Sequence, residues 1–178
     1  MKVLKFGGTS VGSVDSIRQI QHIIGQQTDD CIVVVSALGG ITDQLLKAAH
    51  LALEAGEEYM EVYQAIRCRH MDMVNTLITN PTTRQMLCLE LEGILDELRS
   101  ILFGVHLVKD LSDKTEAAIV SYGERMSSRI VTAALPGAVR KNSLEFIRTD
   151  RKQGQVLLNT SLTEQLVRNA FATLPHLS

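Results

Sequence analysis

The amino-acid sequence predicts an α/β fold in which a mainly parallel sheet is flanked by helices. Two short apolar segments, residues 2–6 (KVLKF) and 31–35 (CIVVV), are bounded by glycine or serine and are typical of buried parallel strands. Between them, residues 14–24 carry apolar side chains at helical spacing, with Ser13 placed to cap the helix and Gly25 to end it. A strand, a helix and a second strand in this order form a βαβ unit, which implies parallel pairing.

The rest of the chain is predicted to be mostly helical. Apolar side chains recur at steps of three and four in four segments, at about residues 42–55, 59–77, 82–104 and 115–135. The second and third are separated by Asn80-Pro81, and so short a connection predicts antiparallel packing. Beyond them we expect strands over 144–147 and 156–158, a helix over 162–171, and an exit toward a further strand over 172–178. This expected sheet is incomplete within the chain.

Composition narrows the class of protein. The 178 residues carry a net charge of -2 and are 45% hydrophobic, which suits a globular domain but lacks the basic excess that nucleic-acid binding needs. Apolar runs are too short to span a membrane, and the first residues do not form a signal peptide, so we expect a cytoplasmic protein with neither membrane nor nucleic acid as a partner. Three widely spaced cysteines predict no disulfide framework, and no metal-ligand set is predicted.

The first candidate site is the glycine loop after residues 2–6. Gly7 and Gly8 at the end of a parallel strand, just before a helix, let backbone amides approach an anion. Gly7 and Gly12 have the spacing of a P-loop, but its lysine and hydroxyl residue do not follow, and adjacent glycines do not fit the dinucleotide pattern. Here Lys5 precedes the glycines instead. The alternative is a tight turn beside a solvated lysine.

The second candidate loop follows residues 31–35. Ser36 and Thr42 offer hydroxyl groups, and Gly39 and Gly40 offer bare backbone amides. Ligands of open α/β sheets bind outside the carboxyl ends of the strands, where two such loops face each other. The alternative is that Thr42 only caps the following helix.

The third candidate lies on the helix over 115–135. Ser121 and Glu124 belong to a polar stripe on an otherwise apolar helix, and a glycine within a helix, Gly123, indicates that something approaches closely there. A carboxylate in this stripe could hold a substrate ammonium group. The alternative is a structural ion pair of Glu124 with Arg125 or Arg129.

Together these three features resemble the aspartate kinases of the amino-acid kinase superfamily. The matching segments are residues 5–11 (KFGGTSV), 34–42 (VVSALGGIT) and 121–127 (SYGERMS). The long helical pair over 57–104 is similar to that of the monofunctional lysine-sensitive type or of the bifunctional type fused to homoserine dehydrogenase. The resemblance implies that residues 1–178 are the amino-terminal, aspartate-binding lobe. It places the nucleotide-binding half and the regulatory domains beyond residue 178, and it implies a homo-oligomer for the full-length protein.

The resemblance also implies a reaction, in which Mg-ATP phosphorylates the side-chain carboxylate of L-aspartate to 4-phosphoaspartate. This is the first step of lysine, threonine and methionine biosynthesis, and we expect the isolated chain to be nearly inactive. By position, Lys5 would be catalytic. The residues that would bind the phosphates of ATP are Lys5, Gly7, Gly8, Thr9 and Ser10, and those that would hold aspartate are Ser36, Thr42 and Glu124. The family's Asp-Ala-Arg is matched only in part at Asp150, so no role is assigned to it.

Two other functions stay open. Another carboxylate or carbamate kinase of the superfamily would have no use for Glu124 if its substrate lacked a free ammonium group. A non-catalytic binding or assembly module could use the long helical pair as an oligomer interface. His70, on an apolar stripe, is predicted to be a core histidine rather than a metal ligand.

Overall fold

The computed structural model describes residues 1–152 and 155–172. The chain divides into two compact units, residues 1–138 and residues from 139 onward, which are described separately here. No helix within the described ranges is both long and apolar enough to cross a membrane.

The first unit begins with the predicted βαβ unit, formed by β1 (Lys2–Phe6), α1 (Val14–Gly25) and β2 (Cys31–Val35). The strands pair in parallel, from Lys2 opposite Cys31 to Phe6 opposite Val35. The prediction that both strands are buried was wrong. Side chains on one face, including Phe6 and Val35, pack against the core, whereas Val3 and Val34 on the other face are 64% and 44% exposed. The hydrophobic core therefore lies against one face of this strand pair.

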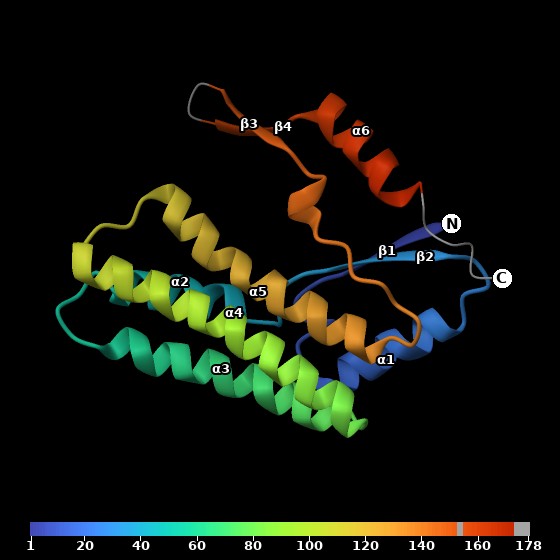
Figure 1. Cartoon of the computed structure of the whole chain (residues 1–178), viewed down its shortest axis with the longest axis horizontal. Helices are drawn as coiled ribbons and strands as arrows, with labels where there is room; N and C mark the ends of the chain where they lie inside the picture. Colours follow the sequence, from blue (N-terminus) through green and yellow to red (C-terminus); the bar gives the residue numbers. More distant parts are fainter. Residues whose placement is uncertain (153–154, 173–178) are drawn as a thin grey trace. The chain divides into compact units, whose positions relative to one another are not determined.

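Helices α2 (Ile41–Leu51), α3 (Glu58–Leu77), α4 (Pro81–Val108) and α5 (Asp113–Ala134) form the bulk of this unit. Figure 1 shows α3 and α4 running antiparallel, as predicted, with α5 alongside α4. The start of α4 is set by Asn80, whose side-chain oxygen accepts a hydrogen bond from the amide of Thr83 at 3.0 Å. Proline occupies the first helical position, where its missing N–H costs nothing.

The core of the first unit lies among these helices. Helix α4 contributes a stripe of fully buried leucines at helical spacing, namely Leu91, Leu95, Leu98 and Leu102. The stripe continues to Val105, so α4 runs past the predicted end near Gly104. Acidic side chains of α4 pair with arginines on the flanking helices, as in Arg67–Glu92 to α3 and Arg125–Glu97 to α5.

The second unit contains a short 3₁₀ helix (Ser143–Glu145), β3 (Thr149–Lys152), β4 (Gln155–Leu158) and α6 (Thr160–Phe171). The predicted strand over 144–147 was wrong, because the Asn142 side chain caps a turn there and the Ile147 amide donates to the Ser143 carbonyl. β3 instead pairs with β4 as an antiparallel hairpin. The strand predicted at 156–158 and the helix at 162–171 are confirmed within a few residues. The expectation for residues 173–178 lies outside the described residues.

Candidate functional site

The first glycine loop, residues 7–12, joins β1 to α1. The amides of Ser10 and Val11 both donate to the carbonyl of Gly7, at 2.9 and 3.2 Å, and fold the loop into a turn. Within the described chain, the amides of Gly7, Gly8 and Thr9 donate no hydrogen bond. The Lys5 ammonium nitrogen lies 3.7 Å from the position that a Cβ atom on Gly7 would occupy. A cation and free amides therefore gather at the carboxyl end of β1, as an anion site requires.

The second loop, residues 36–40, lies directly against the first. Its start is fixed by the Ser36 amide, which donates to the Phe6 carbonyl at 3.2 Å. A Cβ atom added at Gly8 would lie 3.2 Å from the Ala37 carbonyl oxygen, and one added at Gly39 would lie 3.1 Å from the Gly8 carbonyl oxygen. These contacts are tighter than most that Cβ atoms make, so a side chain at either position would require the facing backbone to shift by a few tenths of an ångström.

Helix α2 begins directly after this loop. Gly40, with φ of 79°, is its N-cap residue and provides no side-chain cap. The alternative role of Thr42 as the helix cap was therefore wrong, since Thr42 is the second residue of the helix. Its half-buried hydroxyl group is left for another partner.

Helix α5 packs against the second loop through one turn. The Ala37 amide donates to Glu124 Oε1 at 3.2 Å, and the buried Ser127 hydroxyl donates to the Ser36 carbonyl at 2.7 Å. A Cβ atom on Gly123 would lie only 2.6 Å from the Ala37 Cβ, so the absence of a side chain at this position allows the helix to approach. The structure thus brings Ser36 and Glu124, two of the predicted site residues, to the same place.

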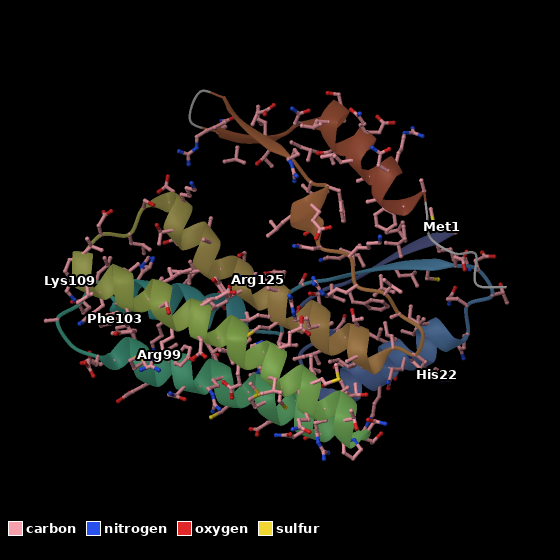
Figure 2. The ribbon with its side chains drawn as sticks, in the orientation of Figure 1. Met1, His22, Arg99, Phe103, Lys109 and Arg125 are labelled. Atoms are coloured by element: carbon pink, nitrogen blue, oxygen red, sulfur yellow. The ribbon has the colours of Figure 1, made fainter. Side chains whose placement is uncertain are left out.

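The proposed structural ion pairs of Glu124 do not form in the described chain. Arg125, labelled in Figure 2, donates to Glu97 at 2.7 Å and lies over the Tyr122 ring at 4.2 Å. The hydrogen bond from Arg125 lowers the pKa of Glu97 below its ordinary value. Arg129 pairs in the same way with Glu90 of α4 at 2.5 Å. The alternative of a Glu124–Arg ion pair is not found, because α4 supplies carboxylates to both arginines.

Arg69 of α3 lies beside the candidate site but was not predicted as a site residue. Its Nη2 donates to the Gly12 carbonyl at 3.3 Å, and its Nη1 lies 3.8 Å from where a Cβ on Gly40 would be. The guanidinium group is therefore hydrogen-bonded to the first glycine loop and lies near the second. It also lines a groove of about 460 Å³ between the first loop and α3. Arg69 is one of several charged residues on α3, so its position on the helix gave no signal.

Ser127 was also missed as a contact of the second loop. The sequence contains two adjacent serines, 127 and 128. They can be distinguished only by the side of the helix on which each lies. Ser127 follows Gly123 by four residues and therefore lies on the same helix face, which was the available signal. Ser128 instead donates to the Arg125 carbonyl within its own helix.

The other candidate residues are less involved. Thr9 and Ser10 lie exposed in the first loop, and Ser121 donates to the Ala118 carbonyl within α5. Asp150 belongs to the second unit, where it accepts a hydrogen bond from Asn159 at 3.0 Å. Among the described residues, no three His, Cys, Asp or Glu side chains are grouped so as to hold a metal ion.

Comparison with known proteins identifies the family of this chain. A sequence model of the amino acid kinase family matches residues 1–175. The chain belongs to this family. It is 32% identical over 137 residues to aspartokinase 2, chloroplastic, of Arabidopsis thaliana, covering 75% of this chain and 24% of that protein. It is 30% identical over 141 residues to the bifunctional aspartokinase/homoserine dehydrogenase of Buchnera aphidicola, covering 76% and 17%. The chain thus spans about a quarter or less of these relatives.

A solved structure shows the same fold. Crystalline E. coli aspartokinase III in complex with aspartate and ADP matches with a TM-score of 0.82 and 26% identity, over 97% of this chain and 38% of that one. The same enzyme in complex with lysine and aspartate gives the same values. The predicted α/β fold class and the resemblance to aspartate kinases are therefore confirmed.

Proposed function

We propose that this chain provides the aspartate-binding side and the phosphate loop of an aspartokinase. The observation that carries this proposal is the direct contact of the two glycine loops, with the Glu124 carboxylate hydrogen-bonded to the second of them. An anion site and a carboxylate that could hold an ammonium group are thereby adjacent. The similarity to aspartokinases, one of which is solved in two complexes that contain aspartate, supports the choice of substrate.

The first loop is the phosphate side of the proposed site. Lys5 would neutralise charge on the phosphoryl group in transit, and the free amides of Gly7 and Gly8 would donate to its oxygens. Thr9 and Ser10 would lie near the phosphates. Positioning and charge stabilisation are most of what phosphoryl transfer requires from a protein.

The second loop and α5 are the aspartate side. Ser36 and Thr42 would offer hydroxyl groups to the substrate, and the second oxygen of Glu124 would accept from its ammonium group. An oxygen of the substrate carboxylate attacks the γ-phosphorus of Mg-ATP, the bond from that phosphorus to the bridging oxygen breaks, and ADP leaves. This carboxylate is already ionised at neutral pH, so the reaction needs no general base.

The wider assignments follow from the same proposal. Residues 1–178 would form the amino-terminal lobe, and the surface for the ATP base would belong to further chain. Magnesium would enter with ATP as part of the substrate. The product would feed lysine, threonine and methionine synthesis in the cytoplasm, and the whole protein would be a homo-oligomer.

Titration of the ¹⁵N-labelled chain with L-aspartate tests the aspartate side. We expect chemical-shift changes at the Ser36, Ala37 and Thr42 amides, and at least a tenfold weaker affinity in Glu124→Gln because an ion-paired hydrogen bond is lost. Glu116→Gln removes the same charge from the first turn of α5 and should bind as the wild type does. Tighter binding of N-acetyl-L-aspartate than of L-aspartate would instead indicate another carboxylate kinase.

Titration with tripolyphosphate tests the phosphate side. Shifts should concentrate on the amides of Gly7, Gly8 and Thr9, and Lys5→Ala should weaken binding by about tenfold through the lost charge. Lys2→Ala, on the same strand but hydrogen-bonded to Gln27, is the matched control. Equal losses in the two variants would contradict a specific role for Lys5.

A further inference from the structure

Ser127 is a buried hydroxyl group whose hydrogen bond leaves its own helix. It is one of three fully or nearly fully buried polar residues among those described, and its side chain is 0% exposed. A buried hydroxyl costs free energy unless it is hydrogen-bonded, so packing alone would favour an apolar residue here. The Ser127 hydroxyl lies 2.7 Å from the Ser36 carbonyl and only 3.4 Å from the Glu124 carbonyl in its own helix. The shorter bond is the one to the loop.

Ser127 and Glu124 hold opposite ends of a single peptide group. The Ser36 carbonyl and the Ala37 N–H belong to the same peptide unit, and in a trans peptide they point in opposite directions. Ser127 donates to the carbonyl and Glu124 Oε1 accepts from the N–H. One turn of α5 therefore fixes the rotation of this peptide plane.

Gly123 allows both contacts to form at once. Its missing side chain lets α5 approach the Ala37 methyl group, Leu45 and Ile41 of the second loop and α2. Without this close approach, neither the serine nor the carboxylate would reach the peptide unit. The three residues, at positions i, i+1 and i+4, lie within about one turn of α5.

We propose that Ser127 is a positioning residue, which orients the Ser36–Ala37 peptide and through it the Ser36 hydroxyl and the Glu124 carboxylate. This inference rests on the proposed function, in which those two groups face aspartate. The carboxylate needs the Ala37 N–H to hold one oxygen, so that the other is directed at the ligand. Loss of the serine hydroxyl frees the peptide to rotate, which disturbs both groups without removing either.

The test compares Ser127→Ala with Ser128→Ala in the ¹⁵N-labelled chain. Both variants lose a hydroxyl group from the same turn of α5, but Ser128 bonds only to its own helix. In Ser127→Ala we expect about tenfold faster hydrogen exchange at the Ala37 amide, which corresponds to the free energy typical of one hydrogen bond. We also expect about tenfold weaker binding of L-aspartate. In Ser128→Ala both should stay within about twofold of the wild type. Exchange at Leu98 in the core should not differ between the variants, because a general loss of stability would accelerate it as well.

Each outcome decides the inference. Equal Ala37 exchange in the two variants overturns it, as does weaker aspartate binding without faster exchange, since that would indicate direct contact of Ser127 with the ligand. If the wild-type chain binds no aspartate, the proposed function fails, while the exchange comparison still decides whether Ser127 fixes the peptide. Should Ser127→Ala not fold, Ser127→Cys keeps a weak donor and should show the same local acceleration to a smaller extent.

Discussion

Acidification should destabilise this chain through His70, a histidine in the core of the first unit. Its side chain is 0% exposed, and its Nδ1–H donates to the Ile66 carbonyl at 2.7 Å. The other ring nitrogen, Nε2, is buried without a hydrogen-bond partner. A proton added there would create a buried charge whose new N–H finds no acceptor. The sequence prediction of a core histidine was correct, although only one of its two nitrogens is satisfied.

The size of this effect follows from the pKa. Desolvation by burial is the main cause that lowers the pKa of His70 from 6.5 to about 4, and the nearby Arg69 charge adds to it. Between these two values the unfolded chain binds the proton and the folded chain does not, so stability falls as the pH falls. From about pH 7 to about pH 5 the expected loss is about 2 kcal/mol, and it is complete only below the folded pKa.

Urea unfolding at both pH values measures this loss. His70→Gln removes the titrating ring, so the difference in unfolding free energy between wild type and variant should shrink by about 2 kcal/mol on going from about pH 7 to about pH 5. Met73→Ala, a buried change on the same helix, should destabilise by a similar amount at both pH values. A wild-type-to-His70→Gln difference that does not change with pH would refute the reasoning.

Three further predictions concern stability and are checked by urea unfolding at neutral pH. Gly93→Ala, where an added Cβ meets nothing within 4 Å, should stabilise α4 by up to about 1 kcal/mol. Gly123→Ala should instead destabilise the chain by about 1–3 kcal/mol, because its Cβ would clash with Ala37. Equal effects of the two substitutions would contradict the close approach of α5. Asn80→Ala should cost about 1 kcal/mol by removing the cap of α4, and no loss would show that Pro81 alone sets the helix start. Leu98→Ala should cost about 2–5 kcal/mol by opening a cavity in the core, and a loss below that range would show that the helices collapse around it.

Local signals in the sequence were sufficient to predict the helices that apolar spacing and capping residues determine. The spacing of apolar residues predicted α1 and the long helical pair, and Ser13 was correctly identified as a cap, since its hydroxyl accepts from the Ser16 amide. Those signals failed where two local solutions compete. The apolar run at 144–147 fits a strand, but the side chain of Asn142 favours a turn. No residue within the run indicates which of the two conformations forms.

The site was predictable in its composition but not in its contacts. The sequence placed Glu124 on a polar stripe and Gly123 at a close approach, and both are found. It could not show that Glu90 and Glu97 of α4 take the arginines beside Glu124, because helix pairing across the core decides that. For the same reason, the contact of Ser127 with the Ser36 carbonyl requires the packing of two elements that are 91 residues apart in sequence.

The glycine-to-glycine contact between the two loops has a mechanical consequence. A Cβ atom added at Gly8 would lie 3.2 Å from the Ala37 carbonyl oxygen, and one added at Gly39 would lie 3.1 Å from the Gly8 carbonyl oxygen, so no layer of side chains separates the loops at this contact. Arg69 is hydrogen-bonded to the first loop beside this contact. Any sliding of one loop past the other would therefore move backbone directly against backbone. We expect any closure of the proposed site around its substrates to move elements outside these two loops.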